Sequence, residues 1–372
     1  MAQSPAESDQ DKELAFPEAP ETKTGQIKLL PSPGFRKWLS QNKVSLAFNT
    51  YHIGKLFMIG LDQAGKFVFS DANFQRSMGL SLHDGTLWMA GYKQIWRLEN
   101  FLDKGQESQG HDAIFAPIGA TTTGYINLHD VRVSDSGVYF TSCQFNCVAK
   151  LHEKWSFEPI WKPSFISEFA YGDRCHLNCL ELEYGAPRYV TCFADTDTEM
   201  GWRVLPKSNC TGLLIDVQSG KILCDTLHMP HSPQLHRNKL YVANSGMGEL
   251  AEVDRKTGKY NPICFIPGFT RGLSFWKDYA LVGASKPRRQ GVFEGNDETP
   301  LNQKLQEQGL EPECSISVVN LKTREIEHKI VIEGVASEIY DVCILPGLRR
   351  PLVVDLESHA LNTMFRPSRL YI

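Results

Sequence analysis

The sequence lacks the features that identify membrane-spanning and exported chains. None of its stretches approaches the roughly 18 continuous apolar residues of a transmembrane helix. The first part of the chain, residues 1 to about 28, is polar, acidic and proline-containing, without the basic start and apolar run of a signal peptide. We therefore expect a cytoplasmic protein that does not bind a membrane.

The chain also lacks an excess of charge of one sign. It has 39 Lys and Arg residues against 43 Asp and Glu residues, a net charge of −4, so no overall basic field attracts nucleic acid. A phosphate-binding loop, a dinucleotide fingerprint and a His-Glu-x-x-His zinc motif are all missing. The partners that remain are a small molecule, a peptide or a protein.

Cysteine is not scarce, but its setting argues against disulfides. Ten cysteines without a signal peptide are typical of reduced thiols. Cys143 and Cys147 form one C-x3-C pair, and Cys175 and Cys179 form another with His176 between them. Zinc usually selects C-x2-C pairs, and most of the cysteines lie in apolar segments that resemble strands. We interpret them as buried structural thiols, with a zinc site as the alternative.

The sequence contains a strand pattern that occurs six times. Each copy begins with a variable residue, called the pivot here, followed by a small or acidic residue and an apolar alternation. The pivots are Met78, His129, Asn178, His231, Arg271 and Tyr340, spaced 51, 49, 53, 40 and 69 residues apart. A period of roughly 40–50 residues with several strands per repeat is typical of a β-propeller. We predict an all-β, six-bladed β-propeller with four-stranded blades.

The two ends of the chain are expected to share one blade. Little chain follows Tyr340, whereas Ser45–Asn49, Lys55–Leu61 and Lys66–Phe69 match the second to fourth strands of a blade. A shared blade closes the ring without exposed sheet edges and favours six blades over seven. The expected domains are a disordered acidic tail over residues 1–33 and a single β-propeller over residues 34–372.

Two insertions interrupt the blades. Residues 286–313 lack a strand pattern and explain the longest spacing, and their middle, 300–309, is typical of a short helix ended by glycine. A second insertion, about residues 195–209, lies at the equivalent point of the third blade. Loops at this point emerge on the face where the chain enters the innermost strands. Both insertions are therefore expected to cover one mouth of the channel as lid-like segments.

Strand alternation turns the pivots, and the residues two positions before them, toward the channel. The second layer, nearer the mouth, is then Arg76, Asn127, His176, Met229, Phe269 and Glu338. Buried polar groups need partners, so this ring predicts a ligand site. The substrate-binding candidates are Arg76, Asn127, His176, Asn178, Glu338 and Tyr340. For each single residue the alternative is a side chain satisfied by its neighbours or by water. The same alternation points Asp130 and Asp341 into the blades, where we expect them to brace loops.

Three residues of the ring are candidate catalytic groups. His129 or His231 is suited to act as a general base, and Arg271 to stabilise negative charge. We expect an enzyme, whether hydrolase, lyase or isomerase, that acts on a small anionic or peptide-borne substrate. The alternative is a propeller that binds a peptide or metabolite without chemistry. No cofactor is predicted. The alternative of a divalent metal held by the histidines is disfavoured by the charge of Arg271.

Seven segments carry a resemblance to a known family. They are NTYHIGKLF (49–57), RSMGL (76–80), LHDV (128–131), DRCHLN (173–178), MPHSPQLH (229–236), FTRGL (269–273) and EIYDV (338–342). Together they resemble an uncharacterised bacterial family, domain of unknown function 4915, over about residues 44–355. The resemblance implies a propeller-like β fold and no settled activity. Six-bladed lactonases are a more distant comparison, and their calcium ligands are acidic and amide groups where this ring has imidazoles and arginine.

Overall fold

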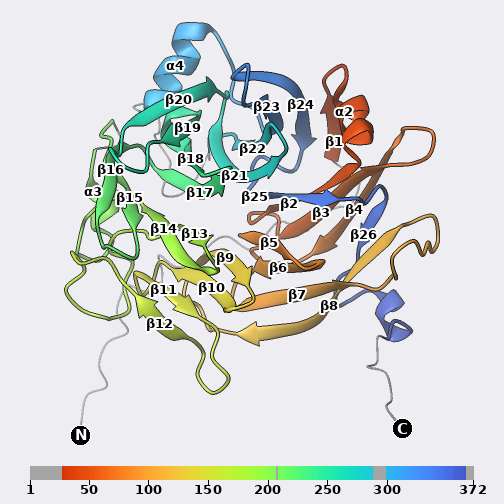
Figure 1. The fold of residues 1–372 in the computed structure, drawn as a ribbon, viewed down its shortest axis with the longest axis horizontal. Helices are drawn as coiled ribbons and strands as arrows, with labels where there is room; N and C mark the ends of the chain where they lie inside the picture. The colour runs from red at the N-terminus through yellow and green to blue at the C-terminus, as the bar shows by residue number, and fades with distance from the viewer. Residues whose placement is uncertain (1–26, 207, 288–298, 366–372) are drawn as a thin grey trace, which may run out of the picture.

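A ring of six β-sheets surrounds the central axis of the molecule (Figure 1). The structure is a computed structural model that describes residues 27–206, 208–287 and 299–365. The sheets are arranged as a six-bladed β-propeller, which confirms the fold class, the number of blades and the closure by both ends of the chain. Each blade is named below by its innermost strand.

Three blades are formed by consecutive antiparallel strands. The β9 blade comprises β9 (Leu128–Ser134), β10 (Gly137–Ser142), β11 (Cys147–Lys150) and β12 (Glu158–Trp161). The β13 blade comprises β13 (Cys179–Glu183), β14 (Ala186–Cys192), β15 (Gly212–Asp216) and β16 (Ile222–Leu227). The β17 blade comprises β17 (Pro230–His236), β18 (Lys239–Asn244), β19 (Glu249–Val253) and β20 (Tyr260–Phe265).

The other three blades combine segments from both ends of the chain. The β25 blade comprises β25 (Asp341–Pro346), β2 (Val44–Thr50), β3 (Lys55–Leu61) and β4 (Phe67–Asn73). The β5 blade comprises β5 (Leu80–His83), β6 (Thr86–Ala90), β7 (Gln94–Asn100), β8 (Ala113–Thr122) and β26 (Pro351–Val353). The β21 blade comprises β21 (Phe269–Trp276), β22 (Tyr279–Ser285), β23 (Ser315–Asn320), β24 (Glu325–Gly334) and β1 (Ile27–Pro31).

Two blades have a fifth, outer strand that the four-stranded prediction does not include. β1 pairs antiparallel with β24, and β26 pairs parallel with β8. Ile27 and Leu29 of β1 pack against the hydrophobic cluster that includes Phe35. The sequence prediction assigns residues 27–31 to the disordered tail. It does so because residues 1–33 as a whole are polar and acidic, although they contain this one short apolar segment. The rest of that tail, residues 1–26, lies outside the described residues.

Few helices accompany the sheets. Helix α2 (Phe35–Asn42) lies between β1 and β2 along the chain, and it buries Phe35, Trp38 and Leu39. The insertions contain α3 (Gly201–Val204) and α4 (Pro300–Gln308), and short 3-10 turns follow β18 and β26 as η1 (Ser245–Met247) and η3 (His359–Asn362). Helix α4 begins after Thr299, whose side chain accepts a hydrogen bond from the Asn302 N–H, and ends at Gly309 with a φ of 61°. No helix in the described part of the chain is long and apolar enough to cross a membrane.

The hydrophobic core lies between neighbouring blades. Leu56 and Met58 of the β25 blade, for example, share a cluster with Leu87 and Met89 of the β5 blade. Fully burying each such side chain stabilises the fold by roughly 1.5–3 kcal/mol. All ten cysteines are unpaired and eight of them are buried, which agrees with their interpretation as reduced thiols.

Candidate functional site

The described parts of both insertions lie at the same end of the channel. Trp202 of α3 packs in a hydrophobic cluster that includes Met229, and Leu301 and Leu305 of α4 belong to another cluster that also contacts Met229. Met229 precedes the pivot His231 by two residues. The side chain of Met229 therefore joins both insertions at the entrance to the innermost strand β17.

A small pocket opens at this end of the channel. Its lining residues are Met229, Ser245, Phe269, Arg271, Ser285, Lys286 and Glu338, and its volume is about 20 Å³. A cavity must have a volume of at least about 10–15 Å³ to hold one water molecule. The pocket therefore has room for the head group of a ligand rather than for a whole metabolite. Two cationic side chains and one carboxylate line it. This mouth pocket favours a group with negative charge.

Three buried polar atoms beside the mouth pocket have no hydrogen-bond partner among the described residues. They are His231 Nε2, Arg271 Nε and the Tyr340 hydroxyl oxygen. The residues come from three consecutive blades and are 2%, 9% and 4% exposed. The guanidinium carbon of Arg271 lies 5.7 Å from the centroid of the Tyr340 ring. Leaving a buried polar group unsatisfied costs about 1–3 kcal/mol, so three such groups together indicate a site for polar ligand atoms.

The hydrogen bonds of His231 determine which ring nitrogen holds the proton. Nδ1 lies 3.0 Å from the Met229 carbonyl oxygen and 2.8 Å from Ser245 Oγ. The Ser245 hydroxyl donates to the Thr270 carbonyl oxygen at 2.5 Å, so Oγ accepts from the imidazole. Nδ1 therefore carries the proton, and Nε2 keeps its lone pair. Burial, and then the charge of Arg271, lower the pKa of His231 well below its usual value. The imidazole is neutral and able to accept a proton.

His129 has the same local geometry one third of the way around the ring. Its Nδ1 lies 3.1 Å from the Asn127 carbonyl oxygen and 3.2 Å from Cys143 Sγ. Burial and the neighbouring His176 lower the pKa of His129 well below its usual value. Its ring lies at 71° to the ring of Tyr340, with the two centroids 6.0 Å apart.

Both imidazoles are oriented by a left-handed residue two positions earlier. Asn127 and Met229 have φ values of 51° and 47°, and Arg76 and His176 occupy the same position in their blades with 50° and 54°. The left-handed backbone accompanies the turn of the Asn127 and Met229 carbonyls toward the imidazoles. Such φ values are uncommon outside glycine, and among these four residues only asparagine and histidine are enriched there. These four residues of the second layer therefore do not continue the innermost strands in an extended conformation. The prediction from strand alternation assumed that they do.

Bulges also interrupt the alternation at three pivots. The register shows one extra residue on the innermost strand in β9, β17 and β21. The residue after the pivot reaches the neighbouring blade both in bulged β9 and in β25, whose pairing with β2 has no register shift. Asp130 Oδ2 accepts the Leu180 N–H at 3.0 Å, and Asp341 Oδ2 accepts the Leu80 N–H at 2.8 Å. The expectation that these aspartates brace loops is wrong, because they tie innermost strands of neighbouring blades together.

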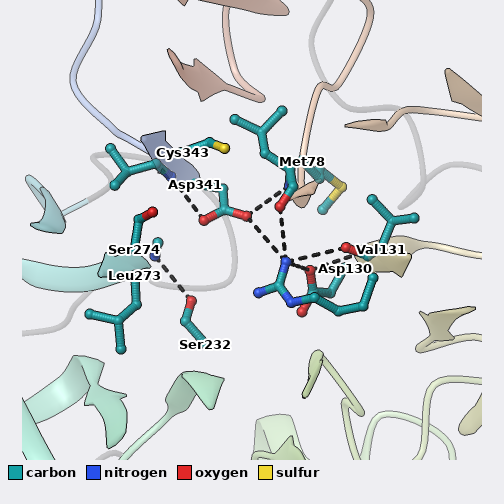
Figure 2. Close-up of polar contacts among 12 residues, drawn as sticks. Met78, Asp130, Val131, Ser232, Leu273, Ser274, Asp341 and Cys343 are labelled. Carbon is teal, nitrogen blue, oxygen red and sulfur yellow. Dashed lines mark hydrogen bonds and ion pairs between the residues drawn. The ribbon is translucent and has the colours of Figure 1, made fainter. Parts of the chain in front are cut away.

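A buried ionic group, called the channel cluster here, lies among these strands. It consists of Arg132, Asp130, Asp341 and Glu181. Arg132 Nη1 lies 3.0 Å from Asp130 Oδ1 and 3.9 Å from Asp341 Oδ2, and Nε lies 3.8 Å from Glu181 Oε2. Figure 2 shows Asp130 and Asp341 within one network of polar contacts. Burial raises the pKa of Glu181 from 4.5 to about 7, against the lowering effect of Arg132. Burial likewise raises the pKa of Asp130.

Several predicted ligand residues already have partners within the protein. Asn178 donates through Nδ2 to the Pro230 carbonyl oxygen at 3.0 Å and accepts from the Thr191 hydroxyl at 2.6 Å. Glu338 Oε1 accepts the N–H groups of Tyr51 and His52, at 2.6 and 2.9 Å. These two side chains hold the innermost strands and the loop after β2 in place.

Two further second-layer candidates, Arg76 and His176, contact aromatic and acidic side chains. The Arg76 guanidinium carbon lies 5.3 and 5.7 Å from the rings of Tyr92 and Tyr125. His176 Nδ1 lies 2.6 Å from Asp173 Oδ2, and its ring packs 4.2 Å from the ring of Trp202. The structure thus brings His231, Arg271 and Tyr340 together and places His129 beside His176.

Comparison with known proteins identifies the family. A family model described as a domain of unknown function, DUF4915, matches residues 33–354. The chain belongs to the DUF4915 family. No curated protein matches its sequence.

Two solved structures are similar to this DUF4915 propeller. One is a chain in the crystal structure of a nidogen/laminin complex, 10% identical with a TM-score of 0.50, covering 82% of this chain and 99% of that one. The other is a protein of unknown function from Bacteroides caccae, 9% identical with a TM-score of 0.49, covering 81% of this chain and 98% of that one. At 10% identity, the first match shows a likeness of fold alone.

The sequence did not indicate every residue of the DUF4915 site. The sequence does not single out Lys286, Asp173 or Trp202. Arg132 was missed although the pattern contains a hint, since two charged residues alternate with two valines in the strand segment Asp130–Val133. Cys143 was assigned to the core, where it also contacts His129.

Proposed function

We propose that the mouth pocket binds the anionic group of a small molecule or peptide, and that His231 acts on the bound substrate as a general base. The observation that carries the proposal is the set of three buried polar atoms without described partners, on His231, Arg271 and Tyr340, next to a pocket lined by two cations. A carboxylate or a similar oxyanion supplies acceptors for the two donors of this set, the Arg271 Nε–H and the Tyr340 hydroxyl.

Arg271 is the proposed anchor for the anionic group. Its guanidinium lines the pocket together with Lys286, while Glu338 is the one carboxylate among the lining residues. A hydrogen bond to a charged group contributes about 1.5–3 kcal/mol when it replaces an unsatisfied buried donor. The Tyr340 hydroxyl is a further donor of the proposed site.

His231 is the proposed base because its Nε2 carries the lone pair. The charge of Arg271 opposes protonation of this imidazole. An anion bound to Arg271 offsets that charge, so the imidazolium formed during proton transfer is more stable when substrate is present. Hydrolase, lyase and isomerase reactions all include a proton transfer of this kind.

The volume of the pocket limits the part of the substrate that enters it. A space of about 20 Å³ accepts a carboxylate-sized head group and leaves the rest of the molecule toward the mouth. This geometry suits an acidic group carried on a peptide or on a longer metabolite. We place the activity in the cytoplasm, since ten unpaired cysteines are typical of a reducing compartment.

The second candidate function is binding without catalysis. It is favoured by Asn178 and Glu338, whose side chains are already hydrogen-bonded within the protein and leave fewer groups for chemistry. A sensor or scaffold needs only the anchor at Arg271 and the surrounding mouth.

The test compares two substitutions against a panel of small carboxylates and short acidic peptides. Arg271→Met should weaken binding about 10- to 100-fold, the equivalent of about 1.5–3 kcal/mol, because the charged hydrogen bonds are lost. His231→Gln should retain binding within about threefold and reduce turnover at least about 100-fold. Arg97→Met, at a half-exposed ion pair with Glu99, is the control.

The outcomes separate the two functions. Equal binding by wild type and Arg271→Met would exclude the mouth pocket as the anion site. Binding that depends on Arg271 while wild type turns over no member of the panel would leave the non-catalytic propeller.

A further inference from the structure

A second cluster of chemically reactive side chains lies beside the mouth pocket and does not line it. Cys143, His129 and His176 each offer a ligand atom, and these three atoms lie within 4.8 Å of one another. Cys143 is 0% exposed, His129 7% and His176 9%. Cys143 follows β10, His129 is the pivot of β9 in the same blade, and His176 lies just before β13. The loops of two neighbouring blades thus converge on one point.

We propose that Cys143, His129 and His176 bind a divalent transition-metal ion of the zinc type, with a fourth position open to water or to a ligand. One thiolate and two imidazoles are the nitrogen and sulfur donors that zinc prefers. Three protein ligands with one open position are the arrangement of catalytic rather than structural zinc sites.

The spacing of the ligand atoms is close to what a tetrahedral ion requires. Bonds of about 2.0–2.3 Å place pairs of ligand atoms about 3.3–3.5 Å apart. Cys143 Sγ and His129 Nδ1 are 3.2 Å apart, and no pair in the group exceeds 4.8 Å. Side-chain movements of about 1 Å therefore complete the geometry.

Asp173 is positioned as an outer-shell partner of the site. Its Oδ2 lies 2.6 Å from His176 Nδ1, and its Oδ1 accepts the His176 backbone N–H at 2.9 Å. The carboxylate is 3% exposed, so this pairing is buried. A carboxylate on one ring nitrogen fixes the tautomer and leaves the other nitrogen with its lone pair for a metal. His176 Nε2 is thereby prepared to coordinate.

The proton and charge balance of metal binding is favourable. Without metal, the Cys143 thiol donates to the Leu177 carbonyl oxygen at 3.0 Å, and His129 Nδ1 donates to the Asn127 carbonyl oxygen at 3.1 Å. Binding releases the thiol proton to solvent as the sulfur–metal bond forms, and coordination through Nδ1 moves the imidazole proton to Nε2. The +2 charge of the ion is then matched by the thiolate and by Asp173. This balance removes the objection that the charge of Arg271 raised.

The same contact between Cys143 and His129 has another chemical interpretation, a thiol nucleophile paired with a base. The geometry argues against it, because a nucleophile must reach its substrate whereas Cys143 is fully buried and its S–H is bonded to a carbonyl. The metal site is independent of the proposed function, since none of its ligands lines the mouth pocket.

The experiment measures metal binding by the full-length protein. We expect about one equivalent of zinc by mass spectrometry and, after removal of zinc, one equivalent of cobalt(II) with the absorption of a cobalt–thiolate bond. Cys143→Ser should lose the cobalt–thiolate absorption. Cys147→Ser, four residues later and equally buried, should keep it. Asp173→Asn should lower the affinity for zinc about 10- to 100-fold without removing a ligand.

Each outcome is decisive for the site. No stoichiometric binding, or equal affinities of wild type and Cys143→Ser, would overturn the proposal. Alkylation of Cys143 that abolishes turnover in metal-free protein would overturn it in favour of the nucleophile. Arg271→Met should bind zinc at least as tightly as wild type, because it removes a positive charge that acts on His129, while its binding of anions is weakened. The failure of one site is therefore distinguishable from the failure of the other. If Cys143→Ser does not fold, the affinity of folded Asp173→Asn decides, because an unchanged value contradicts the proposed outer shell.

Discussion

The mouth pocket and the channel cluster both contain a buried arginine from an innermost strand, Arg271 in β21 and Arg132 in β9, but the partners of the two regions differ. In the channel cluster, Asp130 and Asp341 accept backbone N–H groups of neighbouring blades, and Arg132 lies between them. Even Arg132 Nε, which has no hydrogen bond among the described residues, lies 3.8 Å from Glu181. At the mouth, polar atoms of His231 and Arg271 have no such partner. Both regions contain buried polar side chains. The candidate ligand site differs from the supporting scaffold in that polar atoms of His231 and Arg271 have no described hydrogen-bond partner.

The largest effect is expected from the same substitution at two arginines. Arg132→Met should lower the free energy of unfolding by about 3–5 kcal/mol, because it leaves buried carboxylates without their cation. Arg271→Met should change it by less than about 1 kcal/mol, since the loss of contacts is offset by removal of an unsatisfied donor. Urea unfolding midpoints measure both values. Equal losses of stability at the two positions would remove the distinction between the regions.

The next largest effect is expected from a substitution at a point where neighbouring blades approach each other closely. Gly79 precedes Leu80, and a Cβ atom built on it would lie 2.6 Å from Asp130 Cα and 2.6 Å from Asp130 Oδ1. Gly79→Ala should therefore destabilise the protein by about 1–3 kcal/mol, the cost of overpacking a rigid contact. Gly119→Ala is the matched control, because no atom lies within 4 Å of its added Cβ. A neutral Gly79→Ala would mean that the Asp130 connection adjusts easily.

The smallest effect is a pH dependence that belongs to the channel cluster. Because the folded-state pKa of Glu181 is raised from 4.5 to about 7, the folded protein holds a proton that the unfolded chain has released. The contribution of this carboxyl to stability therefore falls as the pH rises through that range, by at most ~1.4 kcal/mol per pH unit. Glu181→Gln keeps an oxygen that can accept the Leu235 N–H and should remove this dependence.

The measurement is the difference between the unfolding free energies of wild type and Glu181→Gln at several pH values. The difference should shift in favour of the variant as the pH rises from 4.5 to about 7. A shift in the opposite direction would mean that Arg132 outweighs burial and that the cluster stabilises the ionised carboxylate.

Much of the scaffold was predictable from the sequence because it rests on periodicity. Six copies of one apolar pattern gave the number of blades, and the short C-terminal remainder after Tyr340 indicated a shared closing blade. The start of α4 at a capping threonine and its end at Gly309 follow from local backbone chemistry. These features depend on interactions near in sequence or repeated along it.

The site was less predictable because it depends on departures from that pattern. Alternation identified the pivots His231, Arg271 and Tyr340, but not the bulges at β17 and β21 that shape their surroundings. Methionine is not a residue type that indicates a left-handed backbone, so the positive φ of Met229 could not be predicted from its identity. Residue type alone also could not show that both polar atoms of the Asn178 side chain have partners within the protein, whereas His231 Nε2 has no described partner. Those outcomes are set by contacts between blades.

The closure of the ring by strands from both ends of the chain has a consequence for synthesis on the ribosome. β2 and β3 emerge early, but the strand that covers their inner edge, β25, is translated almost 300 residues later. Until then the edge of β2 is unpaired and able to add a strand from another nascent chain. The pairing of β1 with β24, and then of β26 with β8, also awaits the last part of the chain. Completion of the ring is thus a late event, and the newly made amino-terminal half depends longest on chaperones for protection from aggregation.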